Sequence, residues 1–60
     1  DKEYVSPEFY YHLGQVLEGL SENERARIQF EIAIKLIIKM KTKRKDYLDM
    51  KEDIELKLNV

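Results

Sequence analysis

The sequence lacks cysteine and has only one histidine, one proline and two glycines among its 60 residues. Without cysteine, disulfides and thiolate metal sites are excluded, and one histidine is a poor basis for a zinc site. No Ser/His/Asp or Cys/His arrangement for catalysis can be assembled. No apolar run approaches the roughly 18 residues of a membrane span. We therefore expect no enzyme, no cofactor and no membrane segment.

The composition is that of a folded chain, with 43% hydrophobic and 38% charged residues. A domain of this length buries only roughly 60% of the surface that its unfolded form exposes. Small domains of this kind usually gain stability from disulfides, metals or partners. Because the first two are excluded or disfavoured, we expect association with itself or with another protein.

Charge is strongly segregated along the chain, although the net charge is only -1. Residues 1–24 carry six acids and one lysine, and residues 25–45 carry eight basic side chains and one acid. Residues 46–60 return to five acids and two lysines. This pattern favours pairing between segments or between chains.

A first helix is expected over about residues 7–18, after a flexible segment at residues 1–5. Ser6 is a suitable N-cap, and Pro7 is tolerated in a first turn. Apolar residues then recur at spacings of three and four, and we expect them to form the side of this helix that packs in the core: Phe9, Leu13, Val16, Leu17 and Leu20.

The next segment predicts a turn and a second helix. Ser21 and Glu24 have the spacing of a capping box, so the second helix is expected to begin near Glu22. Two helices joined by such a short link fold back on each other. Residues 6–40 are therefore expected to form a helical hairpin.

The second helix is apolar over an unusually wide arc, wider than the little over 100° typical of a surface helix. One stripe, Ile28, Ile32 and Leu36, is expected to pack against the first helix. The rest of the arc, together with Tyr10, is expected to form an interface: Phe30, Ala33, Ile34, Ile37, Ile38 and Met40. This surplus of apolar surface on the second helix predicts that it binds a partner.

Residues 41–60 are expected to form a charged helical extension. Ala33, Met40, Tyr47 and Ile54 are each seven residues apart, which favours one long continuous second helix. The alternative is a third helix that begins at Asp46 as its N-cap.

Residues 6–40 resemble the BESS domain, a motif of insect chromatin and transcription proteins. The resemblance is carried by the spacing of Phe9, Leu13, Leu17 and Leu20 and by the triplet Phe30-Glu31-Ile32. Three polar positions depart from the family pattern: His12 replaces Ser, Gln15 replaces Pro and Gln29 replaces Arg. The apolar skeleton of the pattern is kept.

The resemblance implies a protein–protein association module, often homotypic, in a nuclear protein whose DNA contact is made by a separate domain. Other BESS-containing or transcription-associated proteins are further expected partners.

A basic run follows the second helix: Lys39, Lys41, Lys43, Arg44 and Lys45. It has three interpretations, namely a nuclear-localisation signal, a phosphate-contacting patch and a solvated segment. Stacking aromatics are absent from the run, so direct nucleic-acid contact is the least favoured.

The leading hypothesis is therefore an all-α homodimer of helical hairpins in a four-helix arrangement. A nucleic-acid-binding hairpin that uses residues 39–45 is one alternative. A groove for a helix of an unrelated protein is the other.

Overall fold

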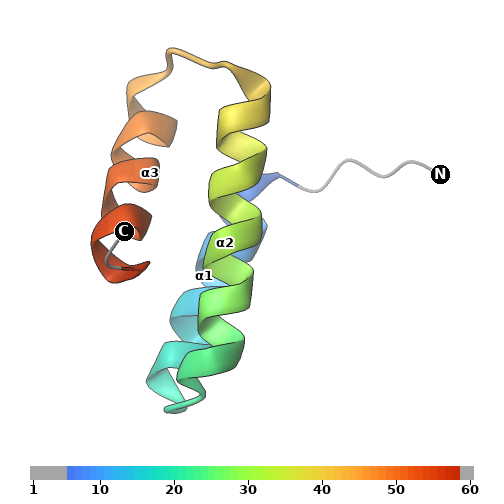
Figure 1. Cartoon of the computed structure of the whole chain (residues 1–60), viewed down its shortest axis with the longest axis vertical. Coiled ribbons are helices and arrows are strands. Elements are labelled where there is room, and N and C mark those ends of the chain that lie inside the picture. The colour runs from blue at the N-terminus through green and yellow to red at the C-terminus, as the bar shows by residue number, and fades with distance from the viewer. Residues whose placement is uncertain (1–5, 59–60) are drawn as a thin grey trace, which may run out of the picture.

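The computed structural model describes residues 6–58, which form three helices and no strand. The helices are α1 (Pro7–Gly19), α2 (Asn23–Met40) and α3 (Lys45–Leu58). Figure 1 shows α1 and α2 as a hairpin, with α3 running back alongside α2. The expected all-helical class and the hairpin are confirmed. The segment 1–5, for which flexibility is expected, lies outside the described residues.

The turn between α1 and α2 lies where the sequence predicts it, but the predicted capping box is wrong. Ser21 has φ 64, in the left-handed region, and therefore belongs to the turn. Glu22 is the N-cap residue of α2, and neither it nor Ser6 makes a capping bond with its side chain. Backbone bonds close the turn instead, among them Glu22 N–H to Leu17 O at 2.9 Å.

The predicted continuous second helix is also wrong, because α2 ends at Met40. Lys41 adopts a left-handed conformation with φ 53 and ψ 38, and its N–H bonds to Ile38 O at 3.2 Å. The chain then reverses, and α3 begins at Lys45, one residue before the predicted cap Asp46. Folding back buries the apolar side of α3, which a lone extended helix would leave in water.

The core lies between the hairpin and α3. Its buried hydrophobic side chains come from α2 and α3: Ala26, Phe30, Ala33, Ile37, Tyr47, Ile54 and Leu58. On α1, Tyr10, Tyr11 and Leu17 pack against them, and Gly14 is buried. The absence of a Cβ at Gly14 leaves room for the Phe30 ring, because a Cβ built there lies 2.6 Å from Phe30 Cε1.

The expected division between core and interface is largely reversed. Phe30, Ala33 and Ile37, expected at an interface, are buried within the chain, and Ile34 and Tyr10 pack against the core. Of that set, only Ile38 and Met40 are exposed. Of the residues expected in the core, Leu17 packs against it. The other seven are exposed or half-buried: Phe9, Leu13, Val16, Leu20, Ile28, Ile32 and Leu36. The reason is that α3, unforeseen in this position, covers the Phe30 side of α2.

Candidate interaction surfaces

The residues displaced from the core gather on one side of the hairpin, which we call the outer face. It consists of Phe9, Leu13, Val16, Leu20, Ile28, Ile32 and Leu36. Four of these side chains are exposed, with exposed fractions of 55% for Phe9, 58% for Val16, 64% for Leu20 and 53% for Ile28. The other three are half-buried.

Helical geometry places the outer face away from α3. At about 100° per residue, the three outer-face positions within α1 (Phe9, Leu13 and Val16) span an arc of about 60°, and the three of α2 span about 80°. Tyr11, which contacts α3, is about 160° from Phe9 around α1. Phe30, which packs with Ile54 and Leu58 of α3, is about 160° from Ile28 around α2. Both helices therefore turn apolar side chains to the side that α3 leaves uncovered.

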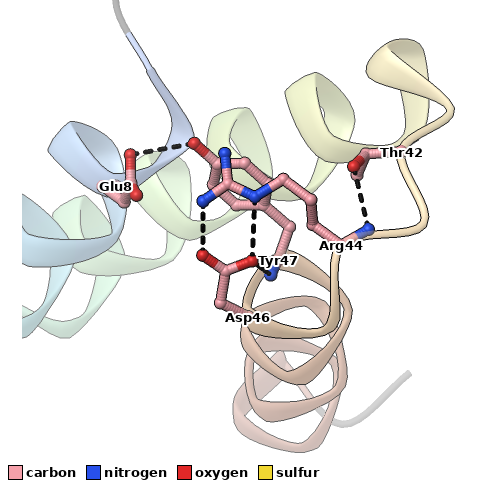
Figure 2. Close-up of polar contacts among 5 residues, drawn as sticks. All are labelled: Glu8, Thr42, Arg44, Asp46 and Tyr47. Carbon is pink, nitrogen blue, oxygen red and sulfur yellow. Dashed lines mark hydrogen bonds and ion pairs between the residues drawn. The ribbon is translucent and has the colours of Figure 1, made fainter.

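Polar contacts hold α3 against α1 along the opposite side of the hairpin. Tyr47 Oη donates to Glu8 Oε1 at 3.1 Å at one end (Figure 2). Lys57 Nζ lies 3.4 Å from Glu18 Oε1 at the other end. The hydroxyl of Tyr47 thus reaches α1, while its ring is buried at the start of α3.

The connection between α2 and α3 is stabilised by short-range contacts around Arg44 (Figure 2). The Arg44 guanidinium pairs with Asp46 at 2.6 Å and lies 4.4 Å from the centroid of the Tyr47 ring. The Arg44 backbone N–H donates to Thr42 Oγ1 at 3.0 Å. The hydrogen bond from Arg44 lowers the pKa of Asp46, so this carboxylate stays ionised to lower pH than usual.

Tyr11 makes the middle contact with α3, and its pKa is strongly shifted. Its hydroxyl donates to Asp53 Oδ2 at 2.5 Å, and this bond, together with burial, raises the pKa of Tyr11 to about 12. The ordinary value is 10.0. A raised pKa means that the folded state holds the proton more tightly than the unfolded state.

Stability should therefore fall as the pH rises from 10 towards 12, the interval between the two pKa values of Tyr11. The Tyr11→Phe variant lacks this ionisation, so its free energy of unfolding should fall less steeply across the same interval. Urea titrations at several pH values measure both slopes. Tyr10→Phe, which makes the same chemical change at the neighbouring position, serves as the matched control. Equal slopes for wild type and Tyr11→Phe would contradict the assignment.

The basic run lies at the turn between α2 and α3 and at its two flanks. All five side chains are exposed: Lys39, Lys41, Lys43, Arg44 and Lys45. Two of them have carboxylate partners, since Arg44 pairs with Asp46 and Lys45 lies 3.8 Å from Asp49. Because the helix is interrupted here, the run is gathered at one end of the molecule instead of spreading around a continuous helix (Figure 1).

Residues 6–58 show few features of other kinds of functional site. No group of three or more histidine, aspartate or glutamate side chains in this range is arranged to hold a metal ion. None of the three helices is both long and apolar enough to cross a membrane. A cleft at the end of the bundle is lined by Glu18, Arg27, Phe30 and Lys57, among others, and His12 lies outside it on the exposed side of α1.

Comparisons with models of protein families, with curated proteins and with solved structures found no match. The resemblance to the BESS domain therefore rests on the quoted residues alone.

Proposed function

We propose that this chain is a protein–protein association module that pairs with a second copy of itself through the outer face. The observation that carries the proposal is the exposure of Phe9, Val16, Leu20 and Ile28 on the side that α3 leaves uncovered. Contiguous exposed apolar surface on a small folded domain is typical of an interaction site. Two such hairpins placed face to face form a four-helix arrangement, with each α3 on the outside.

The net charges of α1 and α2 support a second copy of the chain as the molecule that binds the outer face. Helix α1 carries two acids and no lysine or arginine, whereas α2 carries four basic and two acidic side chains. A two-fold axis that sets α1 of one chain opposite α2 of the other brings unlike net charges together at both ends of the interface. Such complementarity contributes to orientation and encounter rate more than to affinity.

The cellular setting in this proposal comes from the resemblance to the BESS domain. A homotypic module of that kind would join copies of a nuclear transcription or chromatin regulator, and it leaves DNA contact to another domain. Other BESS-containing proteins are then candidate partners for the same face.

Direct nucleic-acid binding by residues 39–45 is a weaker candidate. Arg44 is engaged with Asp46 and Tyr47, and Lys45 lies near Asp49, so part of the positive charge is already compensated. Phosphate-dominated binding falls steeply with salt. A titration of duplex DNA at low salt, with no shift, would remove this candidate.

A charge on the outer face should strongly weaken pairing through that face and leave the fold intact. Val16→Glu and Ile28→Glu each introduce a carboxylate at a position that is exposed in the single chain and buried in the dimer. Burying an unpaired charge costs enough that each variant should weaken the dimer by at least about 100-fold. Sedimentation equilibrium measures the association, and circular dichroism checks that helix content is kept.

Leu56→Glu is the matched control, because Leu56 is 76% exposed but lies on α3, away from the outer face. It should associate as the wild type does. A wild-type chain that stays monomeric at millimolar concentration would overturn the homotypic proposal. Equal dissociation by Leu56→Glu would show that pairing does not use the outer face.

A further inference from the structure

The buried residues of α2 and α3 share one helical register across the turn that separates them. Positions that alternate four and three residues apart run without interruption from α2 to the end of α3: Ala26, Phe30, Ala33, Ile37, Met40, Arg44, Tyr47, Lys51, Ile54 and Leu58. This series contains all seven buried hydrophobic side chains of the two helices. We call it the shared stripe.

A shared register is not required by the folded chain. Residues 41–44 reverse the chain direction, so α3 could have begun at any rotational phase and still turned one side to the core. Alternating four- and three-residue spacing is the pattern that keeps one stripe on one side of a single helix. The sequence therefore matches two arrangements of the same segment, a fold-back and an unbroken helix.

Few features of the turn between α2 and α3 favour the fold-back over an unbroken helix. It contains neither glycine nor proline, and lysine and arginine are good helix formers. Lys41 is left-handed at φ 53, a conformation that a residue with a Cβ adopts at a steric cost. The contacts that hold the turn, from Arg44 to Asp46 and Thr42, are exposed, and exposed pairs contribute little.

We propose that the groove of α2 around Phe30 also accepts α3 of a second copy, giving a dimer with exchanged third helices. In this dimer residues 41–44 join α2 and α3 into one helix. The packing of Ile54 and Leu58 against Ala26 and Phe30 is then remade between chains, so most of the core energy is the same in both states. Exchange of an identical element is a low-cost route to a dimer.

Arg44 is the residue of the shared stripe that opposes exchange. In the single chain it pairs with Asp46 and covers the Tyr47 ring. In the exchanged dimer the two connecting segments run side by side in opposite directions, which brings the two Arg44 side chains together. Like-charge repulsion there weakens the dimer and is screened by salt.

This surface is separate from the outer face, so the test is made in a Val16→Glu background in which outer-face pairing is removed. In that background Arg44→Leu removes the repulsion and the side-chain contacts of Arg44 with Asp46 and Tyr47, and it places an apolar residue in the shared stripe. Its dimer fraction, measured by sedimentation equilibrium, should rise above that of Val16→Glu alone.

Lys41→Gly should act in the opposite direction. Glycine adopts positive φ without steric cost, so the exchanged dimer should weaken by about tenfold for each of its two chains. Ser21→Gly is the matched control, because Ser21 is the other non-glycine residue with positive φ in residues 6–58. Its turn is the same in both states, so the monomer–dimer equilibrium should not change.

A distance measurement decides between exchange and any other pairing. Spin labels on Arg27→Cys and Leu56→Cys, diluted with unlabelled chain, report the distance within one chain. Arg27 lines the same cleft as Lys57 and Leu58, so the labels lie at one end of the folded monomer. One unbroken helix separates the two backbone positions by about 44 Å at a rise of 1.5 Å per residue.

The long distance should appear in the dimer fraction and grow with Arg44→Leu. If the Arg44→Leu chain stays monomeric at the highest soluble concentration, or its dimer shows only the short distance, the exchange proposal is overturned. Neither outcome bears on outer-face pairing of the chain that keeps Val16. The exchange proposal can therefore fail while the outer-face proposal stands.

Discussion

Phe30→Ala should unfold the chain, whereas Phe9→Ala should not. The Phe30 ring is only 2% exposed and lies between Gly14, Tyr11 and the α3 residues Ile54 and Leu58. Truncation of a buried phenylalanine costs about 3–5 kcal/mol. That loss is comparable with the whole stability of a domain of this size. Thermal and urea unfolding, followed by circular dichroism, measure the difference.

Phe9 is the matched control, since the same atoms are removed from a ring that is 55% exposed. Its truncation should cost less than about 1 kcal/mol when measured on dilute monomer. The pair also separates the structure from the expectation drawn from the sequence, in which Phe9 belongs to the core and Phe30 to an interface. A larger loss for Phe9→Ala than for Phe30→Ala would contradict the packing described above.

Gly14→Leu should destabilise the hairpin by about 3 kcal/mol or more, the upper range for overpacking a core. A Cβ at Gly14 lies 2.6, 2.8 and 2.9 Å from three atoms of the Phe30 ring. The ring is enclosed in the core and has little freedom to move aside. Gly14→Ala should also be destabilising, although the better helix propensity of alanine offsets part of the loss. Urea unfolding of the monomer gives both values.

Gly19→Ala is the matched control for the second prediction. It makes the same chemical change in the same helix, but a Cβ there meets no atom within 4 Å. Stability should stay equal or rise by up to about 1 kcal/mol, because glycine is the poorer helix former. If both alanine variants were stabilising to the same degree, close packing of α1 on Phe30 would be wrong.

The features of local structure that depend on neighbouring residues in the chain could be predicted from the sequence. The start of α1 at Pro7, its end at Gly19 and the short turn follow from helix-end chemistry and apolar spacing. The details of capping were not readable. Ser21 has the right residue type and spacing for a cap, but the turn places its backbone in the left-handed region.

Contacts between residues that are distant in the sequence decided which helix packs against each apolar stripe of α2. The sequence shows that α2 has more apolar surface than α1 can cover, but both of its stripes consist of apolar residues. Gly14 favours the stripe that contains Phe30, because the missing Cβ leaves room for the Phe30 ring against α1. Its significance is invisible without the Phe30 ring, which is sixteen positions away in the sequence.

The sequence by itself determined that this chain is helical, that its first two helices form a hairpin and that α2 carries surplus apolar surface. These properties depend on periodicity and composition, which are local. Only the tertiary structure decided that α3 folds back over Phe30 and leaves Phe9, Val16 and Ile28 uncovered. That arrangement depends on how side chains from three helices pack together. Such packing cannot be predicted from any one segment of the sequence.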